Sequence, residues 1–225
     1  MDIPIEPAAD CALCPRLAQF RAENRGAHPD WHNRPVPAFG ETKARLLIVG
    51  LAPGLRGANA TGRPFTGDFA GELLYPTLLA TGFAKGTYGA RRNDGLRLTD
   101  ARITNAVRCV PPQNRPLGPE VRVCGSYLER EIAAMDRLGC IVTLGTVAHG
   151  STLKALGIRP KQAPFGHGAA FETSKGVLIL SSYHCSRLNT NTGRLTPKMF
   201  RLIFDQARVY LDLRRAAARG QGRRT

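Results

Sequence analysis

The 225 residues are enough for one domain with a sizeable core, and 43% hydrophobic with 22% charged residues is ordinary for a globular protein. No apolar run reaches the roughly 18 residues that a membrane span needs, and residues 1–14 lack the pattern of a signal peptide, so we expect a cytoplasmic protein with no membrane partner. The net charge of +15 argues against a neutral surface and favours a polyanionic partner such as nucleic acid, although codon usage in a GC-rich genome can explain the preference for Arg over Lys.

Helical and strand-like segments alternate along the chain. After a polar start and a Pro- and His-rich loop at 26–42, helices are expected at 15–24, 69–79, from Pro119 to about 135, at 146–156 and at 197–213, and strands at 45–50, 101–107, 141–144 and 177–181. Inward-facing positions of the last helix are expected to be Met199, Leu202, Ile203, Val209 and Leu213. Residues 84–99 are expected to form an exposed loop, and 214–225 a flexible basic tail.

This alternation predicts a single domain over residues 1–225 with a three-layer α/β/α sandwich around a central, mostly parallel four-stranded sheet. Ligands of such folds bind beyond the carboxyl ends of the strands. Three interesting segments fall there: the stretch after the first strand, Asn105 at the end of the second, and Tyr183-His184 after the fourth. This convergence predicts a binding site at that edge of the sheet.

The stretch 50–68, GLAPGLRGANATGRPFTGD, is the richest in glycine and leads from the first strand into a helix. Glycines in such a turn bring backbone N–H groups close to a ligand. The stretch has neither the Gly-Lys-Ser/Thr ending of a phosphate loop nor the glycine spacing of a dinucleotide fingerprint. It therefore predicts a binding loop without naming the ligand.

Six cysteines occur, and structural disulfides are unusual in a cytoplasmic protein. Cys11 and Cys14 have a metal-chelating or redox spacing, and with Cys109 and Cys124 they could supply four thiolates to zinc or to an iron–sulfur cluster. Small buried hydrophobic residues are the alternative interpretation. A catalytic pair of Cys185 with His184 is disfavoured because adjacent residues of an extended segment point to opposite faces.

These motifs resemble a known family. Residues 50–54 (GLAPG) followed by 62–68 (GRPFTGD) resemble motif A of the uracil-DNA glycosylase superfamily, and residues 103–109 (ITNAVRC) and 183–196 (YHCSRLNTNTGRLT) are similar to family 5, the type B enzymes. The resemblance implies a monofunctional DNA glycosylase of base excision repair, which flips out uracil and other deaminated bases such as hypoxanthine and xanthine and leaves an abasic site. It also implies that Cys11, Cys14, Cys109 and Cys124 hold a [4Fe–4S] cluster, with zinc as the alternative.

The chemistry of the residues is compatible with that activity, because N-glycosidic cleavage needs a stacking wall, donors for the base oxygens and a group that offsets the sugar cation. Gly50, Leu51 and Ala52 would form the floor of the base pocket, Phe65 its wall, and Asn105 and His184 its polar contacts. Each also has a structural alternative: a core Phe, a turn cap after the strand, or a structural His.

Asp68 is the expected catalytic carboxylate, because Leu51 stands where many relatives carry a polar catalytic residue and no other acid lies between Glu41 and Glu72. It could equally be the N-cap of the following helix. In the segment after His184, non-proline residues occupy two usual proline positions. There Leu188 aligns with the wedge that relatives insert into the DNA helix, and Arg187, Asn189 and Arg194 are expected DNA contacts.

Two other functional classes fit part of the sequence. A non-catalytic nucleic-acid-binding protein with a metal staple would explain the charge and the cysteines, but not the polar residues at one sheet edge. An esterase-like hydrolase is disfavoured because no G-x-S-x-G elbow occurs. The expected protein is therefore a monomeric glycosylase acting on damaged, double-stranded DNA.

Overall fold

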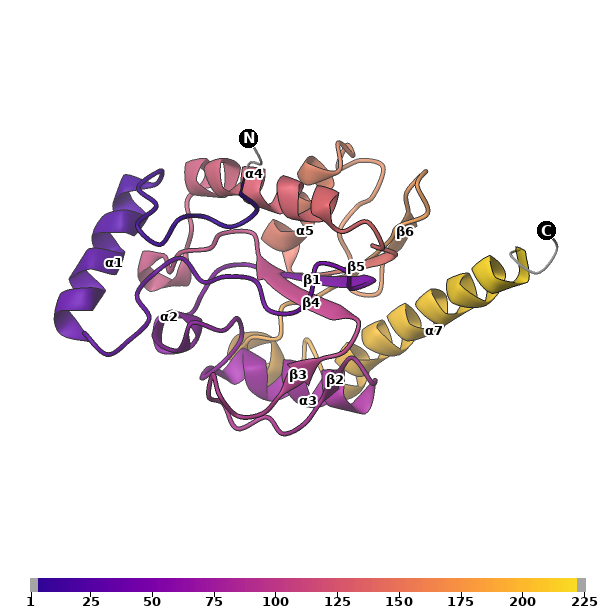
Figure 1. The fold of residues 1–225 in the computed structure, drawn as a ribbon, viewed down its shortest axis with the longest axis horizontal. Helices are drawn as coiled ribbons and strands as arrows, with labels where there is room; N and C mark the ends of the chain where they lie inside the picture. Colours follow the sequence, from indigo (N-terminus) through magenta and orange to yellow (C-terminus); the bar gives the residue numbers. More distant parts are fainter. Residues whose placement is uncertain (1–3, 222–225) are drawn as a thin grey trace.

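The computed structural model describes residues 4–221 (Figure 1). Its elements, in chain order, are α1 (Pro15–Ala27), β1 (Leu46–Gly50), α2 (Ala58–Thr61), α3 (Phe69–Ala80), β2 (Ala84–Lys85), β3 (Arg97–Leu98), β4 (Ala101–Asn105), a 3₁₀ turn (Pro112–Asn114), α4 (Gly118–Ala134), β5 (Cys140–Leu144), α5 (Thr146–Ala155), β6 (Ala170–Glu172), β7 (Leu178–Ser182), α6 (Arg187–Asn191) and α7 (Pro197–Gln221). No helix among the described residues is long and apolar enough to cross a membrane.

The central sheet has the strand order β4-β1-β5-β7-β6. The first four strands run parallel, as expected, and β6 pairs antiparallel with β7 at the edge. The expectation of four strands is corrected to five. The additional strand spans only three residues with no buried side chain, so it lacks the apolar run that marks the other four.

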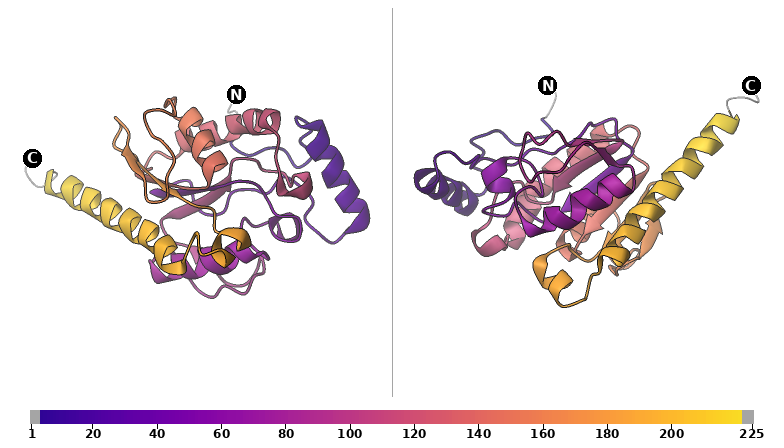
Figure 2. Two further views of the ribbon diagram at one scale, coloured as in Figure 1. Left: turned by 180° about the vertical axis from the view of Figure 1, so that it is seen from behind. Right: turned by 90° about the horizontal axis from the view of Figure 1, so that it is seen from below.

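Alternate residues of β1 point to opposite faces of the sheet and give each face its own core. Leu46 and Ile48 pack on the side of α3 and α7, whereas Leu47 and Val49 pack on the side of α4 and α5. The views in Figure 2 show the sheet between these helix pairs. The three-layer α/β/α architecture is therefore confirmed.

The last helix differs from the expectation in length and in orientation. Residues 214–221 were expected in a flexible tail but continue α7, which projects beyond the body of the protein (Figure 1). The predicted inward residues Leu202, Val209 and Leu213 are exposed, whereas the buried positions are Phe200, Ile203, Phe204, Ala207 and Leu211. The helix carries apolar residues on two faces, and the face with two phenylalanines buries more area.

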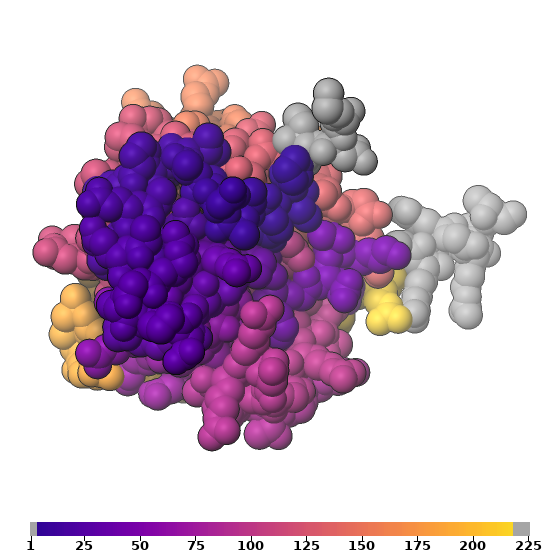
Figure 3. All heavy atoms as spheres, turned by 60° about the vertical axis from the view of Figure 1, so that its left-hand side comes forward, coloured from indigo at the N-terminus to yellow at the C-terminus, as the bar shows by residue number. Residues whose placement is uncertain are grey.

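Residues 84–99 also differ from the expected exposed loop. β2 and β3 form a short hairpin, and Ala84 and Leu96 at its base are buried in the main core. The tip at residues 89–93 is exposed. In Figure 3 this magenta segment projects below the indigo N-terminal segment.

Candidate active site

The carboxyl ends of β1 and β4 lie side by side, because Gly50 pairs with Asn105 in the sheet register. The pairing continues past the strands, where the N–H groups of Ala106 and Val107 donate to the carbonyls of Gly50 (2.9 Å) and Leu51 (3.0 Å). The predicted floor of the pocket is therefore continuous with the sheet and rigid.

Gly50 brings the Asn105 amide and the Phe65 ring into contact above it. A Cβ at Gly50 would lie 2.4 Å from Asn105 Oδ1 and 2.5 Å from Phe65 Cζ, so only glycine leaves room for both. Asn105 is 3% exposed, and its Oδ1 has no hydrogen-bond partner among the described residues. An unpaired buried acceptor is costly, which points to a ligand that pairs with it.

Phe65 is buried and has a φ of +54°, in the left-handed region that a residue with a side chain seldom adopts. This conformation accompanies a ring that faces His184, with 6.2 Å between the ring centroids and 28° between the planes. The Phe65 and His184 rings therefore lie nearly parallel and face each other.

His184 directly follows Tyr183 at the end of β7, and the Asn189 amide donates to its carbonyl oxygen at 2.8 Å. Its Cβ lies against Gly145, where an added Cβ would be 3.4 Å away. Burial lowers the pKa of His184 to about 4. The imidazole is therefore neutral at pH 7 and can donate one N–H to an oxygen of a ligand.

Asp68 begins α3. Its Oδ1 accepts from the Gly71 N–H at 3.2 Å, so the N-cap interpretation is correct as far as this oxygen goes. The other oxygen faces the glycine-rich loop, 2.5 Å from a Cβ placed on Gly57 and 3.1 Å from one on Gly54. Burial raises the pKa of Asp68 above that of an ordinary carboxyl group. Capping thus fixes one oxygen and leaves the other turned toward the binding loop.

The segment after His184 forms the short helix α6, capped by Ser186. Leu188 on this helix is 72% exposed. Arg187 stacks on the Phe69 ring with 5.3 Å from its guanidinium carbon to the centroid, and Arg194 stacks on Tyr183 at 4.4 Å. Arg187 and Leu188 therefore lie on the same exposed helical turn, and Arg194 packs on Tyr183, the residue before His184.

Four cysteines from three segments meet at one small cavity between α1, the loop after β4 and α4. Cys11, Cys14, Cys109 and Cys124 line it together with apolar residues and Tyr127. Burial raises the pKa of Cys14 to about 11 and that of Cys109 to about 12, and the Arg108 N–H donates to Cys124 Sγ at 3.3 Å. No three His, Cys, Asp or Glu side chains within residues 4–221 are arranged to hold a single metal ion. A set of four thiols around one enclosed cavity nevertheless fits a thiolate-bound group.

Known proteins match this chain over most of its length. Residues 37–208 match the uracil DNA glycosylase superfamily. The type-5 uracil-DNA glycosylase of Thermus thermophilus is 42% identical over 91% of this chain and 95% of its own length. That of Pyrobaculum aerophilum is 40% identical over 93% and 88%, and that of Mycobacterium tuberculosis 42% over 88% and 77%.

The chain belongs to the type-5 branch of the uracil-DNA glycosylase superfamily.

Within this glycosylase fold, the remaining cysteines have a plain structural place. Cys140 and Cys185 are fully buried in the main core, and burial raises the pKa of both thiols well above the usual range. Cys185 is thus a core residue, which argues against a catalytic pair with His184. It fills a proline position of the family motif by packing inward.

Sequence reasoning missed several residues around Phe65. The Tyr88 and Tyr75 hydroxyls donate to the Phe65 and Pro64 carbonyls, and Arg63 pairs with Asp94. No local signal marks the Arg63–Asp94 pair, because the acid nearest to Arg63 in sequence is Asp68, in the same motif. The expectation that residues 84–99 were merely exposed concealed that partner.

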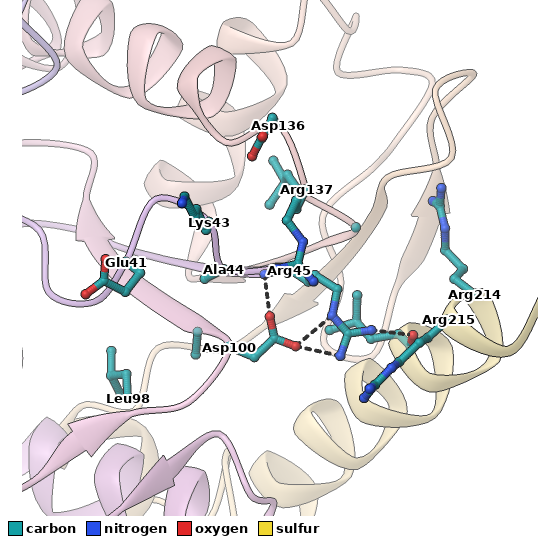
Figure 4. Close-up of a pocket in the computed structure, with 14 residues that line it drawn as sticks. Glu41, Lys43, Ala44, Arg45, Leu98, Asp100, Asp136, Arg137, Arg214 and Arg215 are labelled. Atoms are coloured by element: carbon teal, nitrogen blue, oxygen red, sulfur yellow. Dashed lines mark hydrogen bonds and ion pairs between the residues drawn. The ribbon is translucent and has the colours of Figure 1, made fainter. Parts of the chain in front are cut away.

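A groove of about 940 Å³ lies at the opposite, amino ends of β1, β4 and β5 (Figure 4). In it the Arg45 side chain pairs with Asp100, with 2.7 Å from Nε to Oδ2, and donates to the Leu211 carbonyl at 2.8 Å. None of the predicted site residues lines this groove. It therefore offers a partly exposed arginine–carboxylate pair, Arg45 with Asp100, that is independent of the predicted site residues.

Proposed function

We propose that this protein hydrolyses the N-glycosidic bond of deoxyuridine in DNA and leaves an abasic site. The observation that carries the proposal is the buried, unpaired Oδ1 of Asn105, held over Gly50 beside the Phe65 ring. An apolar wall next to one amide is the arrangement that a flipped pyrimidine requires, since the base stacks on the ring and pairs along its edge. The names of the type-5 relatives agree with this substrate.

The base would stack on Phe65, with Asn105 at its Watson–Crick edge. There the amide Oδ1 accepts the ring N–H of uracil, and the Nδ2 donates to a neighbouring carbonyl oxygen. Neutral His184 donates an N–H to a base oxygen as the leaving base gains negative charge. Gly50, Leu51 and Ala52 would form the floor, which the hydrogen bonds from the segment after β4 to the Gly50 and Leu51 carbonyls hold in place.

Bond cleavage moves the electron pair of the glycosidic bond onto the base and leaves positive charge on the sugar. Asp68 is the carboxylate proposed to offset that charge and to orient the attacking water. The water bonds to the sugar carbon and gives its proton to the Asp68 carboxylate, and the departing base anion takes up a proton from solvent. Leu51 cannot activate water, so this task falls to Asp68. The hydrogen bond that the Gly71 N–H donates to Asp68 holds the carboxylate in place and leaves it ionised.

We propose that double-stranded DNA is the natural partner and that α6 opens it. Leu188, exposed beside the pocket, would enter the space left by the flipped base, as apolar wedges do. Arg187 and Arg194 would contact the flanking phosphates. Asn189, whose amide donates to the His184 carbonyl, would also contact DNA. The protein would act as a monomeric single domain with the chromosome in the cytoplasm.

Hypoxanthine and xanthine are proposed as further substrates. The first motif carries Leu51 and Ala52, small or apolar residues without directional polar groups, so it provides no side chain that rejects a larger base. An amide can turn to pair with either arrangement of donors and acceptors. These features support tolerance of several deaminated bases.

The deciding experiment is base release from duplex DNA with a single uracil, hypoxanthine or xanthine, followed by alkali to cleave at abasic sites. We expect strand breaks only at the lesion, and only after alkali. Binding to the same duplex without base release would instead support a non-catalytic nucleic-acid-binding protein. Asn105→Ala, with Asn93→Ala at the exposed hairpin tip as its control, ties any activity to this pocket.

The four gathered cysteines are proposed to hold a [4Fe–4S] cluster that ties the N-terminal segment to the loop after β4 and to α4. The cluster would supply structural cross-linking, because its ligands come from three separate segments. Anaerobically purified protein should absorb at about 400 nm and contain iron and sulfide. Cys14→Ser should lose this absorbance and lower the Tm, whereas Cys140→Ser, in the core, should keep it. Stoichiometric zinc without absorbance would favour the alternative metal.

A further inference from the structure

The stacking wall is built on a strained residue. Phe65 has a φ of +54°, which L-residues avoid because the side chain crowds the backbone. Such a conformation persists only where the surroundings fix it, and the ring position depends on it. The contacts that fix Phe65 are therefore part of the pocket although they do not touch the base.

Those contacts approach the backbone on both sides of the ring. The Tyr75 hydroxyl donates to the Pro64 carbonyl at 2.5 Å, and the Tyr88 hydroxyl donates to the Phe65 carbonyl at 3.4 Å. A Cβ on Gly71, in the first turn of α3, would lie 1.8 Å from the Phe65 carbonyl oxygen, so the helix closes the remaining side. Tyr75 and Tyr88 stack on each other with 4.6 Å between centroids.

Arg63 connects this cluster to the hairpin. Its Nε donates to Thr66 Oγ1 at 2.7 Å, and its two terminal nitrogens donate to Asp94 at 2.8 and 2.6 Å. The guanidinium also lies against Tyr75 and Tyr88, at 5.2 and 5.9 Å from their ring centroids. Because the side chains of Arg63 and Asp94 are both buried, removing either partner would leave the other charge without a partner and without water.

Asp94 is itself fixed by the hairpin tip. It accepts the N–H groups of Gly89 at 2.9 Å and of Leu96 at 3.1 Å, and the Arg63 guanidinium holds the pKa of its carboxyl well below the usual range. The carboxylate is therefore charged, immobile and fully paired. A hairpin more than twenty residues away in sequence thus orients the loop that carries Phe65.

We propose that Asp94, Tyr75 and Tyr88 are positioning residues for catalysis, which act by holding Phe65 in its left-handed conformation so that its ring meets the flipped base. The inference rests on the proposed glycosylase activity. None of the three side chains is assigned a contact with the substrate. Their effect on the reaction is therefore expected to pass entirely through the Phe65 ring.

Asp94→Asn tests this with little change in volume. We expect single-turnover uracil release to slow by about 10- to 100-fold, as for a group displaced by about 1 Å, with DNA affinity unchanged. The matched control is Asp100→Asn, which weakens the Arg45 pair at the far end of the sheet (Figure 4). It should lower the Tm in the same way and leave the rate unchanged.

A double-mutant cycle separates positioning from general stability. If Asp94 acts through the ring, Asp94→Asn should add no further loss in a Phe65→Ala background. Equal factors in both backgrounds, or a rate that Asp94→Asn leaves unchanged, would overturn the proposal. Tyr75→Phe, which removes only one hydroxyl, serves in the same cycle if Asp94→Asn does not fold.

A second readout needs no substrate. Backbone couplings and chemical shifts of Phe65 in isotope-labelled protein report its φ directly. We expect them to leave the left-handed range in Asp94→Asn and Tyr75→Phe, and to stay there in Asp100→Asn. If the wild type releases no uracil, the proposed function fails, whereas this measurement still decides whether the hairpin fixes Phe65. Unchanged couplings in both variants would contradict the inference.

Discussion

Replacing Gly50 with alanine should disable the proposed site without removing a polar group. The added Cβ would lie 2.4 Å from Asn105 Oδ1 and 2.5 Å from Phe65 Cζ, where ordinary contact begins at 3.4 Å. Both side chains must then retreat by about 1 Å. Because such displacements can cost about 100-fold in rate, we expect single-turnover uracil release to fall by that order. Overpacking of about 1–3 kcal/mol should lower the Tm by several degrees without unfolding the protein.

The assay is single-turnover release of uracil from duplex DNA with enzyme in excess, together with affinity for undamaged duplex, which should not change. Gly150→Ala is the matched control, since a Cβ there meets no atom within 4 Å on the exposed face of α5. It should keep full activity and the same or a higher Tm, because alanine favours helices over glycine. Wild-type excision by Gly50→Ala would refute the claim that Asn105 and Phe65 together enclose the reacting base.

Three further expectations concern the same site. Asp68→Ala should lose far more single-turnover rate than DNA affinity, and near-normal excision would remove Asp68 from the mechanism. On acidification the rate should fall, because burial raises the pKa of Asp68 and its carboxylate is protonated at a higher pH than that of an exposed aspartate. His184, whose pKa is lowered to about 4, is still neutral in that pH range. The residual activity of Asp68→Asn should lack this acid limb, and an unchanged pH–rate profile would assign the limb to another group. Leu188→Ala should slow excision from a paired lesion more than from single-stranded DNA, and equal losses on both substrates would exclude a wedge.

The sheet and its helices could be predicted from the sequence because buried parallel strands are short apolar runs and their spacing by helices admits few topologies. Leu46 to Val49 is such a run, and both faces of it are buried. The convergence of Gly50, Asn105 and His184 followed from the same rule, since the strand ends meet at one edge. Topology therefore brought these residues together before any side-chain contact was known.

The features that could not be predicted from the sequence depend on which of two similar local patterns the tertiary structure buries or pairs. The helix from Pro197 has apolar residues on two faces, and its periodicity does not choose between Leu202 and Phe204 for the core. Likewise, Asp94 lies among exposed glycines and arginines and resembles any loop acid until Arg63 is seen to reach it. Long-range pairing of this kind leaves no local signal.

The distribution of charge connects the fold to the proposed partner. The buried Arg63, Arg102 and Arg108 pair with three acids, Asp94, Glu131 and the partly exposed Glu6. A further buried arginine, Arg21, donates to backbone carbonyls instead. The surplus that produces the net charge of +15 must then lie mainly on the surface. A dispersed positive surface binds any duplex through its phosphates and carries no information about the lesion. We therefore propose that discrimination comes from the residues at the sheet edge, where Asn105 has its unpaired acceptor and Phe65 its left-handed conformation.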